Sequence, residues 1–239
     1  MKNGILDSGQ KIITNGLVLN YDVAQLRSYP KIGTNITDLS GNGNNGTLIN
    51  GVIFNSSNGG ILQFDGVNDY IQSTNPSNLK NQNFTISLWV YPKANTKGLV
   101  TLLDYNHASG ANWVIQSEDA VTNKYYYLAY YSVSAFQPSN GFGAGKGIKI
   151  TNDIWQNIIY VKNGLNVKGY LNGVLNFDVN ASSSTVTYSA TPNLTLSILA
   201  GTVNRSSNNN TSQLQIYNRA LTATEVLQNF NANRSRYGL

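Results

Sequence analysis

Phe84-Thr85-Ile86-Ser87-Leu88-Trp89-Val90 is the stretch of sequence that decides the fold class of this chain. Every second residue in it is apolar, and successive side chains of a β-strand point to opposite faces. The four apolar residues therefore share one face, whereas Trp89 lies on the other face with two hydroxyl side chains. The pattern predicts a β-strand with one face in a hydrophobic core, and Pro92 is expected to end it.

Short segments of the same kind recur along the chain, bounded by turn residues such as Gly, Asn and Asp. Asn172-Gly173 is a preferred sequence for a two-residue type I′ turn, so it predicts a hairpin. Residues 65–69, Asp-Gly-Val-Asn-Asp, predict a second hairpin-like turn. Many short strands separated by turns are typical of an all-β, two-sheet antiparallel sandwich. The other expected strands are residues 17–21, 61–64, 70–71, 99–104, 113–116, 125–131, 158–161, 167–171, 174–177, 194–198 and 213–216.

One short helix is predicted near the C-terminus, at about residues 223–231. Thr222 and Glu225 have the spacing of a capping box, and Leu221 and Val226 have the spacing of a hydrophobic staple. About two and a half helical turns are not stable alone in water, so the helix is expected to pack on the sandwich. Trp89 is expected to be buried under the second layer or under this helix.

The 239 residues are predicted to form one domain, with residues 1–15 as an N-terminal arm and residues 16–239 as the sandwich. All-β domains commonly reach roughly 200–250 residues. Only 11% of the residues are charged, against about 25% in typical soluble domains. The polar surface must therefore come mostly from Asn, Ser, Thr and Gly, which favour turns over helices.

Composition and charge exclude several classes of protein. The net charge is +5, but Lys and Arg are scattered singly, so no nucleic-acid partner is expected. The absence of cysteine excludes disulfides and thiolate catalysis. Residues 1–7 lack the apolar stretch of a signal peptide, and no apolar run approaches the roughly 20 residues of a membrane helix. We expect synthesis in a cytoplasm and no membrane insertion.

Five segments resemble, in this order, the laminin-G-like jelly rolls of the concanavalin A-like lectin/glucanase family. They are residues 39–48, 64–71, 84–90, 170–173 and 216–222. The resemblance spans about residues 16–231 and implies a concanavalin A-like jelly roll.

The C-terminal residues 217–239 are most similar to versions of this fold carried by tailed-phage structural proteins. The resemblance implies a virion component, such as a capsid decoration, head-fibre or tail protein, that is made in the host cytoplasm. Its expected partners are other virion proteins, with a host-surface glycan as a further partner. The alternative is a stand-alone carbohydrate-binding lectin module, and a glycoside hydrolase is a remote third.

Acidic residues are too few and too poorly placed for glycoside hydrolysis, which needs two carboxylates about 5–9 Å apart. The chain has two Glu, and Glu225 is accounted for by the capping box. Glu118 and Asp119 are neighbours and would point opposite ways in an extended segment. The Glu-x-Asp-x-x-Glu strand shared by the related glucanases is missing, and no Gly-x-Ser-x-Gly motif is present. We expect a protein without enzymatic activity.

Four aromatic or imidazole side chains are candidates for ligand binding, because rings near loops can stack on sugars. Three of them have a simpler interpretation. His107, the single histidine, fits a solvated loop, Trp113 fits the core, and one face of residues 125–131 fits the core as well. The candidates are Tyr105, His107, Trp113 and Tyr126.

Calcium is the only cofactor that the resemblance suggests, with Asp65, Asn68 and Asp69 as weak candidate ligands. Ca²⁺ takes six to eight oxygens. Residues 38–43 imitate the start of an EF-hand loop, but the twelfth position is Ile49. Relatives often carry an acidic pair where this chain has Gln213 and Gln215. No cofactor is therefore expected, and the simpler role for the two aspartates is to accept hydrogen bonds from turn amides.

Overall fold

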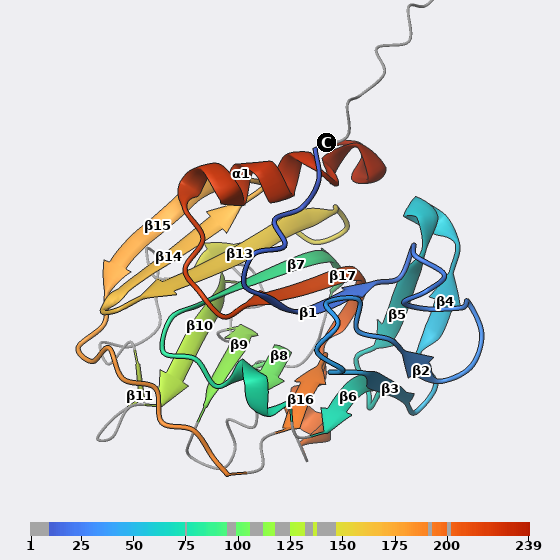
Figure 1. Ribbon diagram of the computed structural model, residues 1–239. Coiled ribbons are helices and arrows are strands. Elements are labelled where there is room, and N and C mark those ends of the chain that lie inside the picture. Colours follow the sequence, from blue (N-terminus) through green and yellow to red (C-terminus); the bar gives the residue numbers. More distant parts are fainter. Residues whose placement is uncertain are drawn as a thin grey trace, which may run out of the picture.

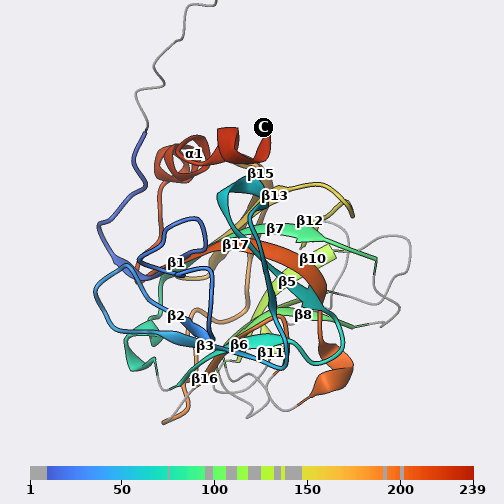
Figure 2. The same cartoon turned by 90° about the vertical axis from the view of Figure 1, so that its right-hand side faces the viewer.

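The computed structural model describes residues 10–74, 76–94, 99–105, 112–117, 125–131, 136–137, 147–190, 193–199 and 202–239. In this part of the chain the strands form two antiparallel sheets packed face to face (Figures 1 and 2). The all-β sandwich expected from the sequence is confirmed.

Sheet A has the strand order β15-β14-β13-β7-β17-β5-β4, and β1 also pairs with β17. Its strands are β1 Leu17–Asp22, β4 Ile53–Asn55, β5 Ile61–Asp65, β7 Phe84–Pro92, β13 Gln156–Asn163, β14 Asn166–Leu171, β15 Val174–Asn180 and β17 Asn208–Tyr217.

Sheet B has the order β11-β10-β9-β8-β16-β6-β3-β2, and β12 also pairs with β10. Its strands are β2 Asn35–Ile36, β3 Gly46–Ile49, β6 Tyr70–Thr74, β8 Thr101–Tyr105, β9 Trp113–Ser117, β10 Tyr125–Tyr131, β11 Phe136–Gln137, β12 Ile148–Lys149 and β16 Asn193–Leu196. The helical elements are α1 Ala223–Asn231 and the 3₁₀ turns η1 Ser57–Gly59, η2 Ser77–Leu79, η4 Val203–Arg205 and η5 Arg234–Tyr237.

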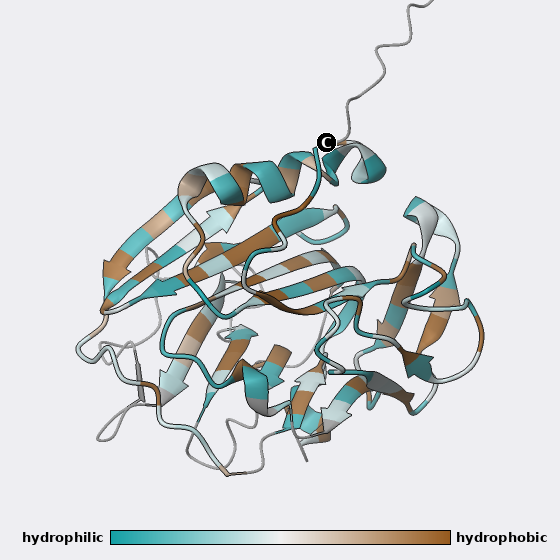
Figure 3. Ribbon diagram, in the orientation of Figure 1, coloured by the Kyte–Doolittle hydropathy of each residue, from teal (hydrophilic) through white to brown (hydrophobic). Residues whose placement is uncertain are grey.

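Apolar and polar residues alternate along β7, and its apolar face enters the core as predicted. Its apolar face belongs to the main core between the sheets, from Phe84 to Val90. Trp89 lies on the outer face and stacks on Phe230 of α1 and Tyr237 of η5. The helix therefore covers this face of sheet A, as predicted, and β7 is buried on both sides. Apolar and polar residues alternate in the same way along neighbouring strands (Figure 3).

The C-terminal helix begins with the predicted capping box. Thr222 Oγ1 accepts a hydrogen bond from the Glu225 N–H at 3.3 Å, and the Glu225 carboxylate accepts one from the Thr222 N–H at 2.8 Å. Arg219 adds a bidentate ion pair to Glu225, with distances of 2.9 and 2.6 Å. Leu221 and Val226 share one apolar cluster, as a hydrophobic staple requires.

The two predicted turns have different outcomes. Asn172 and Gly173 have φ of 51° and 77°, which fits the type I′ turn between β14 and β15. Residues 65–69, in contrast, do not close a hairpin. They connect β5, which pairs with β4 and β17, to β6, which pairs with β3 and β16. The hairpin prediction was wrong because this turn crosses from one sheet to the other.

Residues 10–15 run past α1 toward β1 (Figure 1). The Ile13 N–H donates to Asn229 Oδ1 at 2.8 Å, and the Tyr217 hydroxyl donates to the Ile13 carbonyl at 3.0 Å. Gln228 and Arg219 donate to the Lys11 and Asn15 carbonyls. This part of the N-terminal segment is thus bonded to the C-terminal part of the chain.

None of the helices in the described ranges is long and apolar enough to cross a membrane.

Candidate functional site

Three predicted ligand-binding residues lie in the interior. Tyr105, Trp113 and Tyr126 are 0%, 1% and 2% exposed and belong to the main core. The Tyr105 hydroxyl donates to the Pro76 carbonyl at 2.7 Å, and its ring lies 5.1 Å from that of Trp113. Burial raises the pKa of Tyr126 to about 12. These rings occupy inward-facing positions of β8, β9 and β10, so none of the three is exposed as a sugar-binding ring must be. The core position given as the simpler interpretation for Trp113 and for one face of residues 125–131 is the one that the structure shows. His107 lies outside the described residues.

The aspartates of the 65–69 turn serve the turn itself. Asp65 Oδ1 accepts hydrogen bonds from the N–H groups of Val67 and Asn68 at 2.7 and 3.4 Å. Asp69 Oδ2 accepts one from the Asp65 N–H at 3.2 Å, and burial raises the Asp69 pKa. The turn offers fewer free oxygens than Ca²⁺ takes, so these residues do not fit the ion well.

Asp38, at the start of the EF-hand-like loop, is similarly occupied. Its carboxylate accepts hydrogen bonds from the N–H groups of Asn20, Ser40 and Asn44 at 2.9, 2.9 and 3.1 Å. The Ser40 hydroxyl donates a fourth at 2.8 Å. Asp38 therefore ties this loop to β1. In the described ranges no three His, Asp or Glu side chains gather where they could hold a metal ion.

A polar groove opens on the outer face of sheet B, where β3, β6 and β16 lie side by side (Figure 1). We call it the sheet B groove. It encloses about 310 Å³, at the lower end of the range for small-molecule sites. Its lining residues are Asn50, Tyr70, Gln72, Asn193, Thr195, Ile198, Thr202 and Val203.

Strand register positions the central side chains of this groove. Ile71 points into the main core, so its neighbours Tyr70 and Gln72 point outward. Gln72 stands directly opposite Thr47 of β3 on one side and Thr195 of β16 on the other. Directly opposed residues have Cβ atoms about 5 Å apart, so Gln72 and Thr195 belong to one surface.

The groove offers neutral hydrogen-bonding groups around one aromatic ring. Its lining holds three amide side chains, two threonines, the half-buried Tyr70 and the apolar Ile198 and Val203, and none of its eight residues is charged. The hydroxyl of the buried Thr195 donates to the Ile198 carbonyl at 2.8 Å. Amides and hydroxyls both donate and accept hydrogen bonds, and a tyrosine ring can pack on an apolar face while its hydroxyl stays wet. Such a surface suits a neutral ligand that carries many hydroxyl groups.

Sequence reasoning did not find this groove. The alternation of Leu194 and Leu196 identified the core face of β16 and thus implied that Thr195 faces outward. No local signal showed that β16 lies beside β6, because their pairing joins residues far apart in the chain.

Comparison with solved structures shows the fold. Domain 4 of AbnA, a GH43 extracellular arabinanase from Geobacillus stearothermophilus solved in complex with arabinotriose, is 19% identical with a TM-score of 0.62, and the match covers 88% of this chain and 96% of that one. The binding domain of Paraclostridial Mosquitocidal Protein 1 is 22% identical with a TM-score of 0.68, covering 92% and 52%. The binding domain of botulinum neurotoxin DC, in complex with SialylT, is 14% identical with a TM-score of 0.65, also covering 92% and 52%. The chain spans about half the length of these two toxin domains.

A search of curated protein sequences found no match. The family model that matches describes the concanavalin A-like lectin/glucanases superfamily and covers residues 65–227. Since this match includes more than half of the chain, the protein belongs to the concanavalin A-like lectin/glucanases superfamily.

Proposed function

We propose that this protein is a glycan-binding domain without enzymatic activity, and that the sheet B groove holds a neutral saccharide. The observation that carries the proposal is the uncharged lining, in which three amides, a threonine hydroxyl and two apolar side chains surround the Tyr70 ring. A sugar ring presents an apolar face to an aromatic side chain and hydroxyls to amides. The arabinotriose complex of a structural neighbour supports this ligand class.

The character of the lining supports binding rather than hydrolysis. Glycoside hydrolysis needs a pair of carboxylates flanking the scissile bond, and none of the lining residues that the structure describes is Asp or Glu. Asp104 stands opposite Thr195 on β8, but it is fully buried.

The groove can be tested by calorimetric titration with arabinotriose and by screening an array of neutral glycans. For a glycan that the wild type binds, we expect Tyr70→Ala and Gln72→Ala each to weaken the affinity at least tenfold. Tyr125→Ala is the matched control, because Tyr125 is a half-buried tyrosine of the same sheet outside the groove. Equal losses in Tyr70→Ala and Tyr125→Ala, absence of binding to any glycan, or cleavage of the bound sugar would contradict the proposal.

We further propose that the domain is displayed on a virion, where it contacts other virion proteins and presents its groove to host-surface glycans. The similarity of residues 217–239 to tailed-phage structural proteins supports this role. Co-sedimentation of the protein with intact phage particles tests it, and a protein recovered only in the soluble fraction of infected cells would contradict it. A stand-alone lectin module is the alternative that this second outcome would favour.

A further inference from the structure

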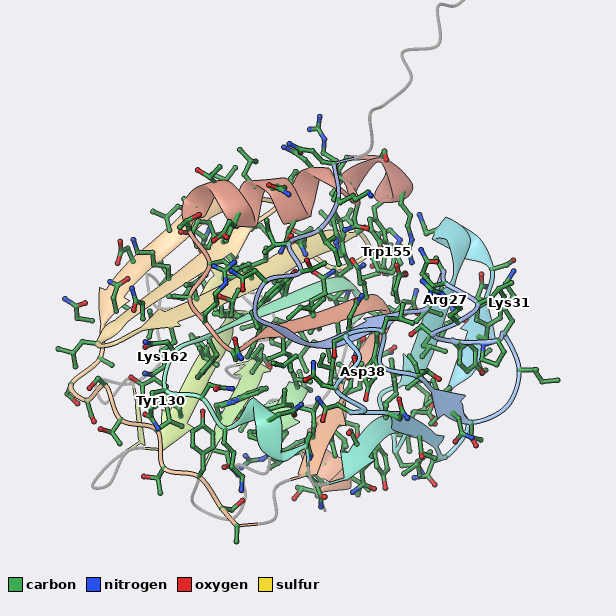
Figure 4. The ribbon with its side chains drawn as sticks, viewed as in Figure 1. Arg27, Lys31, Asp38, Tyr130, Trp155 and Lys162 are labelled. Carbon is green, nitrogen blue, oxygen red and sulfur yellow. The ribbon has the colours of Figure 1, made fainter. Side chains whose placement is uncertain are left out.

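A second cavity lies on the outer side of sheet A, on the face opposite the sheet B groove. It encloses about 540 Å³ between residues 10–14, the residues that follow α1, and the strands β1 and β17. Asn20 and Asp22 of β1 and Gln213 of β17 line it from the sheet, and Lys11 and Arg27 line it from the N-terminal segment and the β1–β2 loop. Figure 4 labels Arg27 on that loop. We call this cavity the N-terminal cleft.

The sheet side of the cleft has polar atoms without hydrogen-bond partners. Asn20 and Gln213 are only 8% and 3% exposed, yet Asn20 Oδ1 and Gln213 Oε1 have no partner. Gln213 Nε2, in contrast, donates to Asp22 Oδ2 at 3.4 Å. Buried polar groups nearly always have partners. Exchanging the oxygen and nitrogen of the Gln213 amide would remove its hydrogen bond to Asp22, so the exchange does not explain the unpaired oxygen.

The charges of the cleft are also unbalanced. The Asp22 carboxylate is paired with Arg236 at 2.8 Å and accepts a hydrogen bond from the Ala24 N–H at 3.1 Å. Lys11 and Arg27, in contrast, form no ion pair with any residue that the structure describes. Asp38 lies next to the lining residue Leu39, but its carboxylate is occupied by four hydrogen bonds to the loop and β1.

We infer that the N-terminal cleft binds an acidic sugar, meaning a saccharide unit that carries a carboxylate. Arg27 and Lys11 supply the cations that a carboxylate requires, and arginine can bind it with two parallel hydrogen bonds. Sugar hydroxyls can donate hydrogen bonds, so they match the two amide oxygens that lack a partner. A simple anion would leave the amides unpaired, and a neutral sugar would leave the cations unpaired.

This site does not depend on the sheet B groove, because the two cavities share no lining residue and lie on different sheets. The chain therefore has one face for an acidic sugar and another for a neutral glycan.

Titration with glucuronate, followed by calorimetry at low ionic strength, tests the inference. Glucose, which lacks the carboxylate, and acetate, which lacks the sugar ring, are the two control ligands. We expect glucuronate to bind at least tenfold more tightly than either. Arg27→Gln and Lys11→Gln should each weaken glucuronate binding about tenfold. Arg234→Gln, which changes an exposed arginine outside the cleft, should leave it unchanged.

The amide side of the cleft has its own variant. Gln213→Leu removes the unpaired amide oxygen, together with the hydrogen bond from Nε2 to Asp22, and leaves both cations in place, so it should weaken glucuronate binding while leaving acetate binding unchanged. Because Gln213 is buried, the folding of this variant is checked by circular dichroism. If it does not fold, Arg27→Gln and Lys11→Gln still test the inference, because they change exposed side chains.

Several outcomes would overturn the inference. Acetate binding as tightly as glucuronate would mean an adventitious ion only. Equal losses in Arg27→Gln and Arg234→Gln would mean a general effect of charge, and no glucuronate binding would mean a cleft filled by water. If Tyr70→Ala abolished glucuronate binding and Arg27→Gln did not, the sugar would occupy the sheet B groove, which would refute this second site.

Discussion

Trp89 and Tyr237 stack with their ring centroids 3.9 Å apart and their planes 15° from parallel. Phe230 of α1 also stacks on Trp89 at 5.7 Å, and Trp155 packs against Tyr237 at 4.9 Å. These aromatic rings attach the C-terminal part of the chain to the outer face of sheet A. Arg236 adds the ion pair to Asp22 of β1, so the last turn is held by both stacking and charge.

Replacing Tyr237 tests how much this stacking stabilises the fold. Tyr237→Ala should lower the free energy of unfolding by about 3 kcal/mol, as is typical when a buried aromatic ring is removed. Tyr237→Phe keeps the ring and should change it by less than about 1 kcal/mol. Urea unfolding followed by tryptophan fluorescence measures the free energy of unfolding of both variants. Similar losses of stability in the two variants would show that stacking of the Tyr237 ring does not stabilise the fold.

Lys162 is a buried lysine that ties three segments together beside Tyr130 (Figure 4). Its Nζ donates to the carbonyls of Gln82, Gly164 and Ser184 at 2.7, 3.2 and 2.6 Å and lies 5.0 Å from the centroid of the Tyr130 ring. Lys162→Met would leave these carbonyls without their donor, so it should lower the free energy of unfolding by about 2 kcal/mol.

Lys168→Met is the control for that variant. Lys168 pairs with Asp178 at 3.2 Å, but both side chains are well exposed, and such surface pairs contribute little. We expect a change of no more than about 0.5 kcal/mol. A larger loss from Lys168→Met than from Lys162→Met, in the same chemical denaturation experiment, would contradict the role assigned to the buried lysine.

The pH dependence of stability should also report on Lys162. Burial lowers its pKa from 10.5 to about 8. Between these values the folded protein has lost the proton and the unfolded chain still holds it, so the free energy of unfolding rises with pH. Denaturation curves from pH 7 to 9 should show this rise in the wild type and a flatter profile in Lys162→Met. Buried tyrosines such as Tyr126, whose pKa is raised from 10 to about 12, act in the opposite direction as the tyrosines of the unfolded chain ionise near pH 10.

Glu225 should dominate a different part of the pH profile. Its hydrogen bonds to Arg219 and Thr222 lower its pKa from 4.5 to about 2. A carboxylate with a lowered pKa stabilises the fold above pH 4.5, and that stabilisation is lost as the pH falls toward 2. Because the pair is partly exposed, we expect the loss to be about 1 kcal/mol.

Glu225→Gln isolates this charge, because glutamine can still complete a capping box. The variant should be less stable than the wild type at pH 6 and equally stable at pH 2, as measured by thermal unfolding. A constant difference between the two proteins across this range would show that the carboxylate charge has no role.

Local patterns predicted the elements that depend on neighbours in sequence. Alternation identified the core face of β7, Asn172-Gly173 predicted its turn, and the Thr222–Glu225 spacing predicted the start of α1. Each of these features arises within a few residues, so a single sequence contains the information. The polar residues 208–212 at the start of β17 were missed, since Asn and Ser carry no strand signal although the strand is paired on both sides there.

Candidate sites were harder to predict than the fold. Aromatic residues are suited both to cores and to sugar sites, and period-2 alternation does not say whether a second layer covers a given face. The second sheet covers the strand faces that carry Tyr105, Trp113 and Tyr126. No second sheet covers the face that carries Tyr70 and Gln72, so these two residues line a surface groove that no sequence motif indicated.

By itself the sequence determined that this protein is an antiparallel β-sandwich with a docked C-terminal helix and few acidic groups. Those properties follow from the spacing of side chains along single segments. Only the tertiary structure decided which strands are neighbours, that residues 65–69 cross between the sheets, and where the two cavities open. Strand pairing joins residues far apart in the chain, and its choice depends on how all the segments fill one interior together.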